Sequence, residues 1–112
     1  MPPITDDQMR ELLTRAQAYT LVLLHSTDAR DRDGADAIVW EHGRRNLELR
    51  EQGVLAIVCP VADDSGVAGV GIFAATPEET AEIMDGDPGV QAGIFTYEVH
   101  PVRGFPGDAL PG

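Results

Sequence analysis

The fold prediction starts from residues 85–99, which read DGDPGVQAGIFTYEV. Asp87 followed by Pro88 is typical of a helix start, because a carboxylate caps free amide groups and proline needs no donor in the first turn. Gly93 then ends that short helical turn. β-Branched and aromatic residues follow and predict a strand over 94–100. An acid at this joint serves either as a plain cap or also as one half of an acid–base pair, and the rest of the chain bears on that choice.

The composition suits one domain, because 112 residues with 43% hydrophobic content provide a single core. The formal charge of -11 opposes nucleic acid and anionic membranes as partners, since binding to phosphate depends on Lys and Arg. One local arginine can still override the average field for a small anionic substrate. No run reaches the ~18 apolar residues of a membrane span, and residues 1–7 lack the pattern of a secretory signal. We therefore expect a cytoplasmic protein.

Periodicity and turn residues predict the elements of the chain. Two of the expected helices begin with a Thr that is followed three residues later by Gln or Glu, the spacing of a capping box. The first strand carries an apolar run without alternation, which is typical of a strand covered on both faces. The predicted elements are a helix at 6–17, a strand at 19–25, a loop at 26–36, a helix at 36–52, strands at 54–59 and 67–75, a helix at 76–85, a strand at 94–100 and an irregular tail.

Without its first helix, this order is β-α-β-β-α-β, which predicts an α+β, ferredoxin-like fold with a four-stranded antiparallel sheet. Right-handed crossovers place both helices on one face and leave the other face bare. That face is apolar, so either the N-terminal helix folds over it or a second copy packs against it. We expect a homodimer, with the extra helix adding cover at an edge or at the interface. The expected organisation is an N-terminal helical extension at 1–18, a domain at 19–103 and an irregular tail at 104–112.

The directions of helices and strands bring His42, on the second predicted helix, to the same end of the sheet as Asp87. His25 is expected at that end too, whereas His100 is expected at the opposite end. A carboxylate fixes the tautomer of a neighbouring imidazole, which titrates near neutral pH, so the two groups suit acid–base chemistry. The spacing alone favours the structural alternative, a hydrogen-bonded core histidine and an aspartate that only caps its turn.

The residues do not favour a metal site, a catalytic serine or a reactive cysteine. Three scattered histidines give no metal-binding spacing, and the acidic loop has Asp36 where a calcium loop needs glycine. No Ser-His-Asp arrangement shows a nucleophile elbow. Cys59 ends an apolar run, and we expect it to be buried as a small apolar residue. We therefore expect neither a metal nor a cofactor.

Several segments resemble the YciI-like (YCII-related) family over about residues 19–103, nearly the whole chain. The most specific is the pattern Asp-Pro-x-Val-x-Ala-Gly-Ile/Leu-Phe, which is present here at 87–95. The other segments are YTLVLLH at 19–25, His42 on the first core helix, GVLAIVCP at 53–60 and EVHP at 98–101. The resemblance implies the dimeric α+β barrel fold, in agreement with the homodimer expected from the bare sheet face.

The resemblance also implies a site. A recurring His on the first helix and an Asp before the short helical turn are regarded in this family as a catalytic pair, and they match His42 and Asp87. Activity in the family is mostly unassigned, but its relatives include a dehydrochlorinase of a chlorinated hydroxyhydroquinone and muconolactone isomerase. The chain departs from the family in its N-terminal helix and at His100, where the family often has a basic residue.

Three hypotheses of function follow. The first is a cofactor-independent isomerase or lyase acting on a small cyclic or aromatic-derived compound, with His42 as the acid–base group and Asp87 as its orienting partner. In this hypothesis His25, Arg45 and Tyr97 are candidates for positioning the substrate. The second is a binding module that holds a small ligand in the same cleft without chemistry. The third is a homodimer with a structural or partner-binding role.

Overall fold

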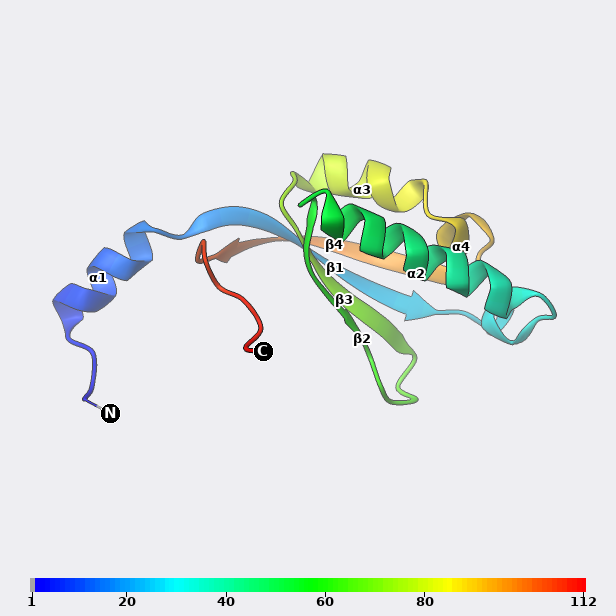
Figure 1. The fold of residues 1–112 in the computed structure, drawn as a ribbon, viewed down its shortest axis with the longest axis horizontal. Coiled ribbons are helices and arrows are strands. Elements are labelled where there is room, and N and C mark those ends of the chain that lie inside the picture. The colour runs from blue at the N-terminus through cyan, green and yellow to red at the C-terminus, as the bar shows by residue number, and fades with distance from the viewer. Residues whose placement is uncertain (1) are drawn as a thin grey trace.

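The structure is a computed structural model and describes residues 2–112. Its elements are α1 (Asp6–Thr14), β1 (Gln17–Ser26), the 3₁₀ turn η1 (Asp28–Asp31), α2 (Ala35–Glu51), β2 (Leu55–Pro60), β3 (Val67–Phe73), α3 (Pro77–Asp85), α4 (Pro88–Gln91) and β4 (Phe95–Gly104) (Figure 1). In the described part of the chain, every helix is too short or too polar to cross a membrane. After α1, the major elements follow the predicted βαββαβ order.

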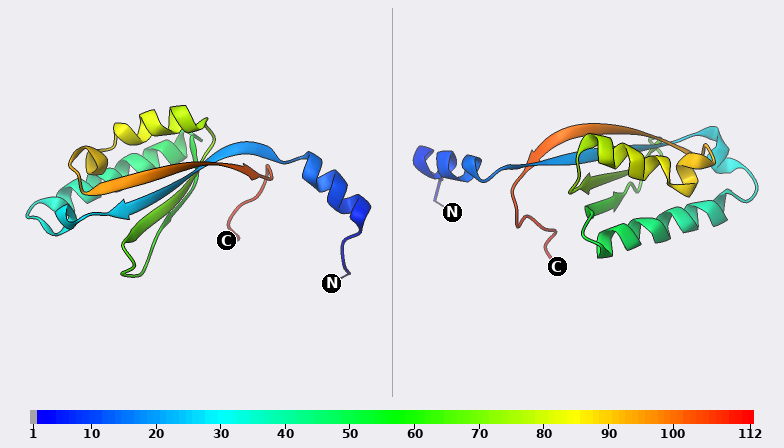
Figure 2. Two further views of the ribbon diagram at one scale, coloured as in Figure 1. Left: turned by 180° about the vertical axis from the view of Figure 1, so that it is seen from behind. Right: turned by 90° about the horizontal axis from the view of Figure 1, so that it is seen from above.

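The sheet is antiparallel, with the four strands in the order β2-β3-β1-β4. Helices α2 and α3 both lie on one of its faces (Figures 1 and 2). This arrangement confirms the ferredoxin-like prediction. The register places Val22 of β1 between Gly71 of β3 and Val99 of β4, so these three positions share the helix-covered face.

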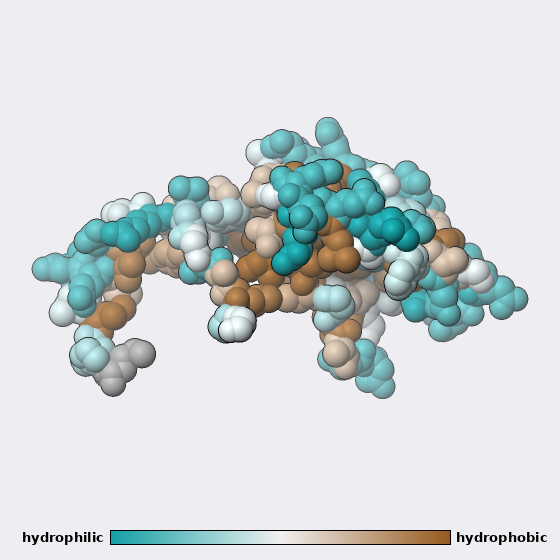
Figure 3. Space-filling view, in the orientation of Figure 1, coloured by the Kyte–Doolittle hydropathy of each residue, from teal (hydrophilic) through white to brown (hydrophobic). Residues whose placement is uncertain are grey.

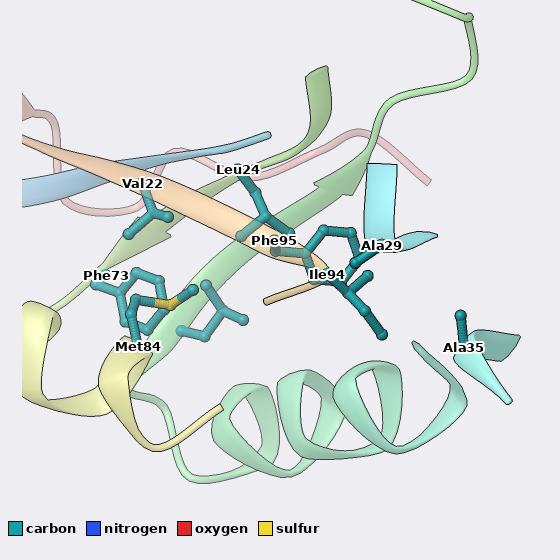
Figure 4. Packing of buried hydrophobic residues seen from close by; sticks show 9 residues of the cluster. Val22, Leu24, Ala29, Ala35, Phe73, Met84, Ile94 and Phe95 are labelled. Atoms are coloured by element: carbon teal, nitrogen blue, oxygen red, sulfur yellow. The ribbon is translucent and has the colours of Figure 1, made fainter. Parts of the chain in front are cut away.

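The hydrophobic core fills the space between the sheet and the helices. Val22 and Leu24 reach into it from β1, and Phe73 lies beside Met84 of α3 (Figure 4). Each large apolar side chain buried here contributes about 1.5–3 kcal/mol. The buried apolar residues are Val22, Leu24, Ala29, Ala35, Leu55, Phe73, Met84, Ile94 and Phe95. This cluster holds α2 and α4 against the sheet and thereby positions the side chains that they carry.

The opposite face of the sheet is bare. Leu21 and Leu23 of β1 point to it and are only partly buried, although the sequence predicted a strand covered on both faces. Within residues 2–112 no helix lies over this face (Figure 2). Helix α1 stands away from the rest of the molecule and contains no buried residue (Figure 1). The alternative that the N-terminal helix folds over its own sheet is therefore wrong, and cover by a second copy stays a prediction.

Two further predictions about the sheet are wrong. Strand β4 does not stop near His100 but continues to Gly104, paired with Gln17 of β1. Pro101 is tolerated because β4 is an outer strand and needs no donor on its free side. Cys59 is exposed rather than buried. Cys59 lies on β2, the other outer strand. Its neighbour Val58 faces the helices, so Cys59 points to the bare face.

Candidate functional site

The candidate site is built around a contact between α2 and α4. The Nδ1–H of His42 donates to the carboxylate of Asp87, at 2.8 Å from Oδ1 and 2.9 Å from Oδ2. His42 is 9% exposed and Asp87 is 0% exposed. The prediction that His42 and Asp87 lie at the same end of the sheet is therefore confirmed.

The N-terminus of α4 holds Asp87 in place. Its Oδ2 accepts from the backbone amides of Gly89 at 3.0 Å and Val90 at 3.2 Å, so the carboxylate caps the helix as predicted. Gly89 has no room for a side chain, because a Cβ there would lie 2.5 Å from a ring carbon of Phe95. The ring of Phe95 also packs on His42, with ring centroids 4.8 Å apart. One aromatic ring therefore supports both halves of the pair.

The electrostatics favour the ionised form of Asp87. Burial is the largest single influence and raises the pKa of this carboxyl. The hydrogen bond and charge of His42, the amide of Val90 and the charge of Arg45 together outweigh it and hold the pKa below its ordinary value of 3.8. An ionised carboxylate at Nδ1 leaves the lone pair of His42 on Nε2, the nitrogen that a proton-transfer reaction would use.

Asn46 is a site residue that the sequence reasoning missed. Its Nδ2 lies 3.2 Å from Nε2 of His42 and donates to it when the imidazole is neutral. The available signal was its spacing, because a residue four positions after His42 lies on the same side of a helix. Asn46 thus reinforces the tautomer that Asp87 selects.

A cavity of about 240 Å³ lies between α2 and the sheet, with His42 and Asn46 in its wall. For scale, an apolar cavity of about 150 Å³ holds benzene in a well-studied protein. The remaining lining is almost entirely apolar. It includes Val22, Leu24, Val39, Leu55, Val58, Phe73, Met84 and Phe95. The site therefore offers a ring-sized apolar space with polar atoms concentrated on α2.

Arg45 lies at the edge of the pair rather than in the cavity wall. Its Nη1 is 3.8 Å from Oδ1 of Asp87, and its side chain is 29% exposed. It reaches the carboxylate across Gly86, where a Cβ would come within 3.0 Å of the guanidinium. The structure thus brings Arg45 to Asp87, where its charge acts on the carboxylate.

The structure does not bring Tyr97 or His25 to the pair. The Tyr97 hydroxyl donates to Asp85 at 2.6 Å, beneath α3, and this hydrogen bond is the main reason that its pKa is raised to about 12. His25 faces the bare side of the sheet, where its Nε2 lies 2.6 Å from Glu98. His100 shares that carboxylate at 3.4 Å, so the expectation that it lies at the far end from His25 is wrong.

Across residues 2–112, no group of three His, Cys, Asp or Glu side chains is arranged to hold a metal ion. The functional groups of the described site are the imidazole of His42, the carboxylate of Asp87, the amide of Asn46 and the nearby guanidinium of Arg45. Together these groups can accept, hold and return one proton.

The fold defines a class of protein. A four-stranded antiparallel sheet with both long helices on one face is the ferredoxin-like class of α+β fold. A solved structure similar to it is the 5-chloro-2-hydroxyhydroquinone dehydrochlorinase TftG from Burkholderia phenoliruptrix AC1100, in complex with 2,5-dihydroxybenzoquinone. The two chains are 19% identical, the match covers 73% of this chain and 90% of that one, and the TM-score is 0.50. No protein-family model matches the chain, and no curated protein does. At this level of identity the similarity supports the fold.

Proposed function

We propose that this chain is a cytoplasmic, YciI-like acid–base enzyme of the isomerase or lyase type, acting without a cofactor on a small cyclic or aromatic-derived compound. The observation that carries the proposal is the buried His42–Asp87 pair in the wall of a ring-sized apolar cavity. The structurally similar dehydrochlorinase acts on a hydroxyhydroquinone and has been captured with a dihydroxybenzoquinone, which supports a substrate of this class.

The chemistry follows from the hydrogen bonds of His42. Its Nε2 accepts a proton from a ring hydroxyl or an acidic C–H of the substrate, and the imidazolium that forms is stabilised by the carboxylate of Asp87. In an isomerase, Nε2 returns the proton to another ring atom. In a dehydrochlorination, chloride leaves with the electron pair of the C–Cl bond and the proton stays on His42 until water takes it. Both reactions balance without an oxidant or a metal.

The bare face of the sheet supports a homodimer as part of this proposal. Leu21 and Leu23 of β1 and Val70 and Ile72 of β3 are paired in register on that face. Apolar side chains on two neighbouring strands are stabilised when a second copy packs against them, sheet to sheet.

A binding module is the second candidate, because one observation favours it. Asp87 already has a structural role, since it caps α4 while it holds His42. The same apolar cavity would then retain a ring compound without converting it.

Chloride release from 5-chloro-2-hydroxyhydroquinone, followed together with binding of 2,5-dihydroxybenzoquinone, tests the proposal. We expect the wild type to bind the quinone and release chloride, and His42→Ala to lower kcat/KM by about 10²–10⁴-fold, the usual contribution of a general acid or base. His25→Ala is the matched control, because that imidazole lies on the other face of the sheet.

Two outcomes would count against the enzyme. Unchanged turnover in His42→Ala would remove the catalytic assignment. Binding of the quinone by the wild type with no turnover of ring compounds of this class would favour the binding module instead.

A further inference from the structure

Helix α1 is an amphipathic helix with no partner in its own chain. Its N-terminus is well formed, with a complete capping box between Thr5 and Gln8. Large apolar side chains nevertheless lie in solvent on one side of it, and no residue of the helix is buried. They are Ile4, Met9, Leu12 and Leu13, which are 60%, 46%, 43% and 52% exposed. A nine-residue helix is marginal in water by itself, so this helix needs a surface to lie on.

A second unpartnered apolar surface runs along the outside of α2. Trp40 and Leu47 are 69% and 56% exposed and border an open groove of about 950 Å³. The floor of the groove is completed by Val58 and Pro60 from the outer strand β2. We call this surface the α2–β2 groove. Its floor and two of its border residues are apolar, and its rim carries the charged residues Asp36, Arg44, Glu48 and Glu51, a pattern that suits the apolar side of an amphipathic helix.

The α2–β2 groove opens onto the cavity that contains His42. Five residues line both spaces, and Asn46, the hydrogen-bond partner of His42, is one of them. The shared residues are Val39, Gly43, Asn46, Val58 and Pro60. Gly43 leaves open space above the helix at this point, since a Cβ there would meet no atom within 4 Å. A helix lying in the groove would therefore cover the mouth of the cavity.

Helix α1 does not lie in the groove of its own chain. The N-terminal end of β1 pairs with the C-terminal end of β4, and this two-stranded ribbon carries α1 away from α2 (Figures 1 and 2). The molecule is 56 Å long in consequence, against 29 and 23 Å in the other directions. In Figure 3 apolar atoms gather on one side of the N-terminal helix and, well apart from them, in the middle of the molecule.

We propose that α1 of one copy lies in the α2–β2 groove of a second copy and closes the mouth of its His42 cavity. This inference rests on the homodimer of the proposed function and adds a helix that each site receives from the partner. Closure by an apolar helix excludes water, which strengthens the electrostatic interaction between His42 and Asp87.

The area needed for a stable dimer supports this occupant. A four-stranded sheet with strands about 4.8 Å apart and about 20 Å of shared length offers roughly 400 Å² per copy. Both copies together then bury roughly 800 Å², below the ~1,200 Å² of a stable interface. Two exchanged helices, each about 14 Å long and about 10 Å wide, raise the total to roughly 1,400 Å². Each copy also carries a charge of -11, and the added apolar contact offsets part of the repulsion between the copies.

Charge substitutions on the two sides of α1 test the proposal. Leu13→Glu puts a carboxylate on the apolar side, and we expect it to raise the dimer Kd, measured by sedimentation equilibrium, by about 30-fold or more. Thr14→Glu is the matched control. It adds the same charge to the same turn of the helix but lies on the polar side, so the Kd should not change. Equal Kd values for both variants would overturn the docking of α1 while leaving the homodimer and the enzyme in place.

Cross-linking identifies the surface on which α1 lies. In a Cys59→Ser background, a Met9→Cys chain mixed with a Leu47→Cys chain of different size should form a disulfide-linked heterodimer. A Glu41→Cys chain is the control, because Glu41 is exposed on α2 but does not line the groove. Equal linkage at both positions would overturn the assignment to the groove. A wild type that is monomeric throughout would overturn the homodimer and the docking together, while the activity of His42 would still be measurable.

Discussion

The two faces of the sheet carry the same chemical contact in different surroundings. On the covered face, His42 lies 2.8 Å from Asp87, with 11% and 1% of the side chains exposed. On the bare face, His25 lies 2.6 Å from Glu98, with 35% and 48% exposed. The exposed contact is the shorter of the two, yet in a single copy of the chain water and salt screen it. Distance alone therefore does not identify a functional pair, whereas burial and the groups that fix each partner do.

The two carboxylates also differ in what else they bind. Asp87 accepts from two backbone amides as well as from His42, so its position is set by the main chain of α4. Within residues 2–112, Glu98 accepts from two imidazoles and from no backbone amide, and its side chain is 48% exposed. The hydrogen bonds with His25 and then His100 lower the pKa of Glu98, but in solvent this has little influence on the fold.

Removing each carboxylate in turn should produce the largest difference between the two pairs. Asp87→Ala leaves a buried N–H of His42 unpaired, which costs about 1–3 kcal/mol, and removes a helix cap worth about 1 kcal/mol. We expect the free energy of unfolding in urea to fall by about 2–4 kcal/mol. Glu98→Ala should lower it by less, because within the chain its contact with His25 is partly exposed and Glu98 caps no helix. Similar losses in the two variants would show that burial is not what separates the two pairs.

The contribution of Asp87 to the free energy of unfolding should depend on pH. The folded pKa of Asp87 is below 3.8, so its contribution is fully present above that unfolded value and is lost as the pH falls through the folded one. The difference in unfolding free energy between the wild type and Asp87→Asn should therefore shrink as the pH falls below about 4. Adding 1 M salt, where the Debye length is about 3 Å, should raise the pKa of Glu98 slightly, because it screens the charges of His25 and His100, and should leave the pKa of Asp87 unchanged. A salt-sensitive Asp87 would contradict its burial.

The smallest expected effect concerns Tyr97, the neighbour of Glu98 on β4 and a residue of the covered face. Its hydrogen bond to Asp85 raises its pKa to about 12, which favours the protonated phenol in the folded state. That contribution is fully present below pH 10 and is lost as the pH rises from 10 to 12. In a Tyr19→Phe background, tyrosinate absorbance should show a midpoint near 12. Asp85→Asn should move it toward 10.0, and a midpoint that does not move would place the cause elsewhere.

The sequence correctly predicted the helices whose ends are marked by capping residues, proline or glycine. Asp87, Pro88 and Gly93 mark the bounds of α4, and the structure confirms the cap and the positive φ of 73° at Gly93. The convergence of His42 with Asp87 was also predictable, because it follows from element directions in a βαββαβ chain.

The wrong predictions concern features that depend on neighbouring strands. Pro101 reads as the start of an irregular tail, but an outer strand accepts it, and β4 continues to Gly104. His25 ends an apolar run, yet the alternation of side chains along β1 sends it to the bare face. Cys59 is exposed for the same reason. None of these outcomes is visible before the strand order and the register are known.

One wall of the cavity and the acid–base pair come from separate layers of the molecule. His42 and Asp87 belong to the helices, whereas Val22, Leu24 and Val58 in the cavity wall belong to strands whose backbone is held by the sheet. A conservative substitution at one of these three strand positions changes the shape of the space, while Asp87 is still held by the backbone amides of α4. The same scaffold can therefore be adapted to different ring compounds, in evolution or by design, by exchanging sheet side chains while its reactive centre stays the same.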